Sequence, residues 1–125
     1  MLTKVTARLS QLGYTVQEAD VPALTFLIQK VEHDICNFCN ITEVPEELNE
    51  VVVDRVAGEY LAQLYGLGQL GEGFSFQQAL TSITEGDSSF HFKDGDSDES
   101  RFKAVLGRMM DSFYEKLLPF RKLRW

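Results

Sequence analysis

Apolar residues recur every three or four positions through most of this chain, and that spacing does most to limit its fold. Side chains at such steps share one face of an α-helix, whereas a strand requires strict alternation. The longest stretch carries apolar residues at Phe102, Val105, Leu106, Met109, Met110, Phe113, Leu117 and Leu118. We therefore expect a mainly α-helical protein.

Two earlier stretches share the spacing and end in residues that terminate helices. The first covers about residues 2–12, and Gly13 follows it as a natural C-terminal residue. The second begins after Asp20, a good N-cap, and runs to about Cys39. Asn40 then tolerates the left-handed conformation that ends many helices. Both stretches are predicted to be helices.

A third helix is predicted from Pro45, with two glutamates in its first turn where the helix dipole favours negative charge. Ala57, Gly58 and Ala62 are small enough to let neighbouring helices approach, so this helix should be buried on more than one side. A glycine-rich link over residues 66–73 follows it. The last helix should be capped by Asp98 and stopped by Pro119.

Residues 78–92 show a different pattern. Thr81 and Ile83 on one side, and Phe90 and Phe92 on the other, flank the turn-forming pair Gly86-Asp87. Alternation around such a pair predicts a β-hairpin, which is marginal in water unless it packs on helices or on another subunit. The expected fold is a small bundle of about four helices, residues 1–119, with the hairpin inserted before the last helix.

The final six residues alternate aromatic or aliphatic side chains with basic ones: Phe120, Arg121, Lys122, Leu123, Arg124 and Trp125. After Pro119 this C-terminal tail has no helix to belong to. It either folds back on its own core, docks on a partner protein, or contacts nucleic acid. Aromatic and arginine side chains are the usual anchors of protein interfaces, which favours the docking peptide.

Charge and hydropathy exclude several functions. The 125 residues carry a net charge of −7, which argues against general DNA binding because that depends on neutralising phosphates. A small helix-turn-helix DNA-binding regulator is the alternative to a structural role, but it needs a basic recognition helix that none of the long helices supplies. No apolar run is long enough for a membrane helix, and no signal-peptide pattern opens the chain, so we expect synthesis in the cytoplasm and no membrane contact.

Cys36 and Cys39 form a CxxC pair. Redox activity needs such a pair at a helix N-terminus, whereas this one falls at a predicted C-terminus. Zinc needs four ligands. Besides the two cysteines, the sequence offers His33 close by and His91 far along the chain. Two partly buried thiols are the simpler interpretation, with no metal and no cofactor. No nucleophile motif accompanies the histidines, so we expect no enzymatic activity.

Three segments in this order resemble a known family. They are Val31–Asn40 continued by Ile41–Leu48, then Ser82–Phe90, then the ending Phe120–Trp125. Together they look like the head–tail connector (adaptor) proteins of tailed phages and prophages of Gram-positive bacteria. The resemblance covers the chain from about residue 20 onward. Cys39 falls where the family motif often has a cysteine, whereas Cys36 departs from it.

The resemblance implies a structural protein of the virion neck, made in the host cytoplasm. Such adaptors form a ring, usually dodecameric, beneath the portal protein, and DNA passes through the lumen without specific binding. Their C-terminal segment anchors to the portal, which matches Phe120–Trp125 here. The hairpin and following loop, about Leu80–Ser97 with Ile83, Gly86, Asp87, Phe90 and Phe92, would meet neighbouring subunits or the next neck or tail-completion protein.

Overall fold

The computed structural model describes residues 1–70, 73–84 and 97–122, and within these ranges it contains helices and no strand. The prediction of a mainly helical chain is confirmed. Short 3-10 turns accompany the helices at Glu18–Asp20, Glu46–Leu48 and Leu118–Phe120. The α-helices are α1 (Leu2–Gln11), α2 (Val21–Cys39), α3 (Asn49–Gly66), α4 (Phe76–Thr84), α5 (Asp98–Asp111) and α6 (Phe113–Leu117).

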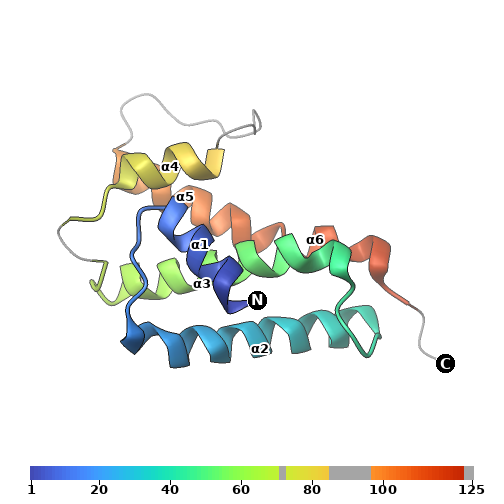
Figure 1. Ribbon diagram of the computed structural model, residues 1–125. Helices are drawn as coiled ribbons and strands as arrows, with labels where there is room; N and C mark the ends of the chain where they lie inside the picture. The colour runs from blue at the N-terminus through green and yellow to red at the C-terminus, as the bar shows by residue number, and fades with distance from the viewer. Residues whose placement is uncertain (71–72, 85–96, 123–125) are drawn as a thin grey trace.

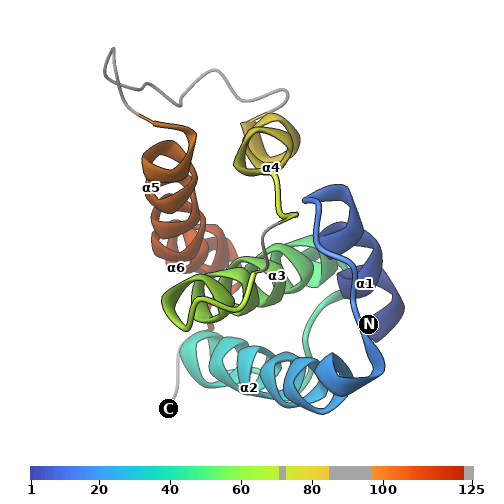
Figure 2. The same cartoon turned by 90° about the vertical axis from the view of Figure 1, so that its left-hand side faces the viewer.

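Helix α3 lies at the centre of the molecule. It contacts α1, α2, α5 and α6, and Figure 2 shows it surrounded by the first, second and fifth helices. The small residues Ala57 and Gly58 are buried, as the sequence predicted for a helix covered on several sides. The buried positions of this helix are Val52, Val53, Val56, Ala57, Gly58, Tyr60, Leu61 and Leu64. The core of the described chain therefore forms around α3.

The predicted ends of the first two helices are confirmed. Gly13 has φ +94° just after α1, a conformation that a side chain would strain. Asn40 has φ 58° and ψ 46° and closes α2 in the left-handed region. Its backbone amide and that of Ile41 both donate to the Cys36 carbonyl. These two turns fix where the chain leaves each helix.

The predicted hairpin is wrong over its first half, because residues 78–84 belong to α4. Phe76, Ala79 and Leu80 also follow helical spacing, and α4 packs along α5, where Ala79 and Leu80 are buried. Burial of this face against a helix outweighs the local strand preference of Thr81 and Ile83. The rest of the predicted hairpin, residues 85–92, lies outside the described residues.

The predicted last helix is divided at Ser112 into α5 and α6. Arg55 of α3 donates from Nη1 to the Met110 carbonyl at 2.6 Å, and its guanidinium lies 4.9 Å from the centre of the Phe113 ring. This contact satisfies a carbonyl in the last turn of α5. The N-cap of α5 is Ser97 and not the predicted Asp98, since the Ser97 hydroxyl accepts from the Ser100 amide at 3.1 Å.

Figure 1 shows that α6 brings the chain back to the end of α2, so that the last described residues lie beside that end. The two segments are far apart in sequence but adjacent in space. None of the helices in the described ranges combines the length and apolar character needed to span a bilayer.

Candidate functional site

The C-terminal tail begins with residues that the fold holds in place. Pro119 lies in the 3-10 turn Leu118–Phe120, and the Phe120 side chain is half-buried against the core. Beyond the turn, the Lys122 amide donates to the Cys39 carbonyl at 2.7 Å, and the Asn40 side-chain amide donates to the Lys122 carbonyl at 2.7 Å. The tail therefore enters the C-terminal cap of α2.

This clamp uses the backbone of Lys122 and not its side chain. The Cys39 carbonyl lies in the last turn of α2, where carbonyls lack partners within the helix. Asn40 has a left-handed backbone conformation, and its side-chain amide donates to the tail at the Lys122 carbonyl. The clamp therefore fixes the position of the backbone at residue 122 and does not depend on the identity of the side chain.

Side-chain contacts reinforce the clamp. The Arg121 guanidinium lies 5.0 Å from the centre of the Phe38 ring, a cation–π arrangement. The Cys39 thiol lies 3.6 Å from the Leu117 carbonyl and donates to it. Arg121 and Lys122 also border an open hollow whose other side is formed by Ile41, Glu43 and Pro45. The root of the tail is thus part of the folded body.

The sequence left three interpretations of the tail open, and the structure bears on its first half. Phe120, Arg121 and Lys122 fold back on the end of α2. Leu123, Arg124 and Trp125 lie outside the described residues. Docking on a partner stays a prediction.

Of the predicted inter-subunit residues, Ile83 alone falls in the described part of the chain. Ile83 lies in α4, a helix and not a strand. Gly86, Asp87, Phe90 and Phe92 lie outside the described residues. Their role at a subunit contact also stays a prediction.

The cysteine pair lies at the C-terminal end of α2, as predicted. Cys36 is half-buried and Cys39 is buried, and burial raises the pKa of both thiols above the ordinary value. In the described ranges no three His, Cys, Asp or Glu side chains are grouped so that they could share a metal ion. His91 lies outside those ranges. The arrangement disfavours a reactive thiolate.

Asp20 has a role that sequence reasoning missed. It stands at the N-cap position of α2, as predicted, but its side chain makes no capping bond there. It is instead 9% exposed and accepts hydrogen bonds from the Tyr14 hydroxyl at 2.9 Å, the Gln17 amide at 2.8 Å and the Tyr60 hydroxyl. One carboxylate thereby ties the link between α1 and α2 to the central helix α3.

The electrostatics of this cluster follow from its hydrogen bonds. Burial alone would raise the pKa of Asp20, but the donors Tyr60, Gln17 and Tyr14 outweigh it and lower the pKa below the ordinary value. Burial and the Asp20 carboxylate raise the pKa of Tyr14 to about 12, and they raise the pKa of Tyr60 as well. The cluster is therefore a charged carboxylate that accepts hydrogen bonds from neutral donors. We interpret its role as structural.

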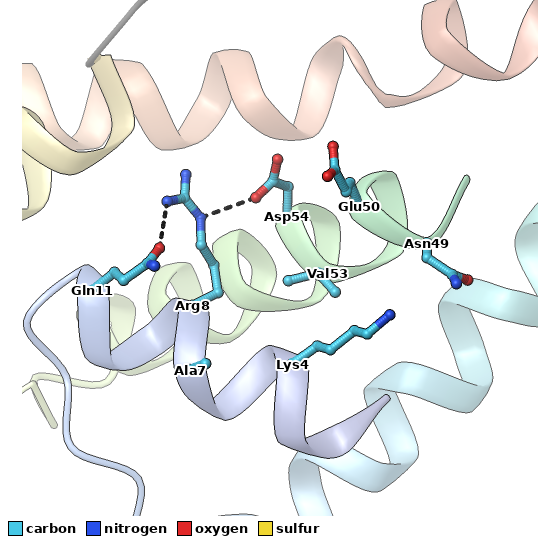
Figure 3. A pocket seen from close by; sticks show the side chains of 8 residues that line it. All are labelled: Lys4, Ala7, Arg8, Gln11, Asn49, Glu50, Val53 and Asp54. Atoms are coloured by element: carbon cyan, nitrogen blue, oxygen red, sulfur yellow. Dashed lines mark hydrogen bonds and ion pairs between the residues drawn. The ribbon is translucent and has the colours of Figure 1, made fainter. Parts of the chain in front are cut away.

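A second open hollow lies between α1 and α3, with a volume of about 420 Å³ (Figure 3). Arg8 of α1 pairs with Asp54 of α3 at 3.0 Å and also donates to Gln11 at 3.1 Å. Lys4 and Glu50 add one charge of each sign to the lining. Because the charges are mixed and the central pair is internally satisfied, this hollow has no clear ligand preference.

Comparison with models of protein families, with curated proteins and with solved structures found no match.

Proposed function

We propose that this chain is a structural subunit of the neck of a tailed phage, a head–tail connector that forms a ring beneath the portal protein. Three ordered segments of its sequence resemble that family. The observation that supports it most is the tail: an aromatic and basic ending whose root is fixed to the end of α2 by the Lys122 backbone. A docking peptide that starts from a fixed point would suit a partner that must be engaged in one orientation.

The net charge of −7 agrees with a ring through which DNA moves. DNA is held by cations that replace its counterions, so an acidic lumen wall would offer it little affinity. A ring also needs head-to-tail contacts, in which two different faces of each subunit are complementary. We assign one of these contacts, or the contact with the next neck protein, to the segment after α4 that includes Gly86, Asp87, Phe90 and Phe92.

The structure sharpens the truncation that tests this proposal. Removing residues 120–125 would also remove Phe120 from the core and the Lys122 amide from the cap of α2. Removing only Leu123–Trp125 spares both. The shorter deletion should leave the helical content and unfolding midpoint unchanged while heads and tails fail to join, as counted by electron microscopy of particles.

The matched control is Phe26→Ala, which removes a large apolar side chain that is 65% exposed near the other end of α2. This variant should join heads to tails normally. Normal joining by the Leu123–Trp125 deletion would show that the tail does not dock on the portal.

The alternative of a DNA-binding regulator is separated by a gel shift at low salt. The connector proposal expects no sequence-specific complex, because α2 and α3 carry more acidic than basic residues. A specific complex that survives competitor DNA would favour the regulator.

A further inference from the structure

One residue of the cysteine pair contacts the end of the chain at two points. The Cys39 thiol donates to the Leu117 carbonyl at 3.6 Å, and the Cys39 carbonyl accepts from the Lys122 amide at 2.7 Å. Leu117 is the last residue of α6, and Lys122 is the residue that the clamp holds. Figure 1 shows this segment beside the end of α2. The position of Cys39 therefore helps to set where the segment after α6 lies.

Cys36 lies one helical turn before Cys39 and is the more accessible of the two. It is half-buried, whereas Cys39 is fully buried. In an ideal helix, Cα atoms three residues apart are about 5 Å from one another, within the roughly 4.4–6.8 Å that a disulfide spans. The two side chains also interact, because the charge of Cys36 is one of the causes that raise the pKa of Cys39. A local change in the last turn of α2 can therefore join the pair.

Joining the two sulfurs requires this last turn to tighten. Cβ atoms three residues apart on a helix are about 5–6 Å apart, whereas a disulfide needs about 3.5–4.5 Å. The turn that must move ends at Asn40 in the left-handed region, where the Asn40 amide donates to the Cys36 carbonyl. It also carries the Cys39 carbonyl that the clamp uses. Disulfide formation would therefore draw the Cys39 thiol away from Leu117 and displace the acceptor of the Lys122 amide.

We propose that Cys36 and Cys39 are a redox switch on the tail clamp: reducing surroundings leave the clamp closed, and oxidation of the pair to a disulfide opens it. The oxidant is a low-molecular-weight disulfide such as oxidised glutathione. The half-buried Cys36 thiolate breaks its S–S bond, which gives a Cys36–glutathione mixed disulfide and one glutathione thiol. Cys39 then attacks the Cys36 sulfur, displaces the second glutathione and closes the Cys36–Cys39 bond. The pair gives up two electrons and two protons, which the two glutathione thiols take up.

Burial makes this exchange slow and separates it from catalysis. It raises the pKa of both thiols, so the thiolate that must attack is scarce near pH 7. Slow exchange suits a switch that responds to a lasting change of surroundings, whereas an enzyme must turn over repeatedly. The inference is independent of the connector function, since it concerns contacts within one chain.

The test incubates the folded chain with oxidised glutathione and follows two quantities. Intact-mass spectrometry should show the loss of two hydrogen atoms per chain, with no glutathione retained. Hydrogen exchange of the Lys122 amide, followed by NMR, should accelerate about fivefold, the change expected when one backbone hydrogen bond is lost. Dithiothreitol should restore the original rate. The Tyr14 amide, which donates to the Leu9 carbonyl at the end of α1, is the internal control and should not change.

Cys36→Ser is the matched variant, because it keeps Cys39 and both of its contacts with the end of the chain but cannot form the disulfide. Its Lys122 amide should exchange at the same rate with and without oxidised glutathione. An equal acceleration in this variant would overturn the inference. A disulfide that leaves the Lys122 rate unchanged, or one that unfolds the whole chain by circular dichroism, would also overturn it. Oxidation that stops at the mixed disulfide or joins two chains, and the absence of any reaction, would do the same.

Discussion

Asp20→Ala should lower the free energy of unfolding by about 3–5 kcal/mol, because it removes a buried charged acceptor and strands its three donors. The carboxylate is 9% exposed and joins Tyr14, Gln17 and Tyr60. A hydrogen bond to a charged group contributes about 1.5–3 kcal/mol, and the three bonds share one acceptor and do not add fully. Tyr60→Phe should cost about 1.5–3 kcal/mol, and Tyr14→Phe should cost less because that side chain is only half-buried.

The assay is urea unfolding followed by circular dichroism. With a slope of about 1.5–2 kcal/mol/M, the Asp20→Ala midpoint should fall by about 1.5–3 M. Asp54→Ala is the matched control: its carboxylate is 40% exposed and pairs only with Arg8 among the described residues, so a loss of about 0–1 kcal/mol is expected. If Asp20→Ala were no more destabilising than this control, the cluster would not tie α3 to the link before α2.

The same cluster sets a pH dependence. The folded pKa of Asp20 lies below its ordinary value, so its contribution is complete above the unfolded pKa of about 4. As the pH falls below that value, the contribution is lost. The difference in stability between wild type and Asp20→Ala should therefore shrink as the pH falls from about 5 through about 4 and on toward the lowered folded pKa.

Other consequences concern the tail clamp, the aromatic core and the thiols. Asn40→Gly keeps the left-handed cap but removes the side-chain bond to Lys122, so hydrogen exchange near residue 122 should accelerate. Asn40→Ala should lower the free energy of unfolding by about 1 kcal/mol more than Asn40→Gly, because the alanine Cβ disfavours φ 58°. Phe102→Ala should lower the free energy of unfolding by about 3–5 kcal/mol, since this fully buried ring contacts Tyr65, Phe74 and Phe76. A smaller loss of stability in thermal unfolding would mean that the neighbouring side chains move in to fill the cavity. Both cysteines should react slowly with a disulfide reagent at pH 7, because burial raises the pKa of both thiols. Cys36 should react before Cys39, which is more fully buried, and rapid labelling of Cys39 would contradict its buried position.

Sequence reasoning succeeded where residues with special backbone preferences mark a helix end. Asn40 ends α2 in the left-handed region, and Gly13 takes a positive φ after α1. These residues act locally, so their effect is readable without tertiary structure. The small residues of α3 also indicated correctly that several helices cover it.

The failures share a dependence on distant contacts. Thr81 and Ile83 favour a strand locally, but α4 forms because its apolar face is buried along α5. Asp is a good cap residue, yet the two tyrosine donors recruit Asp20 into the interior, and Tyr60 stands 40 positions away. The site at which the tail is held is likewise formed by Cys39 and Asn40, about 80 positions earlier in the chain. The local sequence around these two residues gives no indication of that contact.

The most direct measurement is electron microscopy of this chain mixed with the portal protein. We predict a ring of subunits on the portal, with the C-terminal tail directed toward it. We further predict that deletion of Leu123–Trp125 abolishes the complex without unfolding the chain. A chain that stays folded but forms no ring and does not bind the portal would contradict the proposed function.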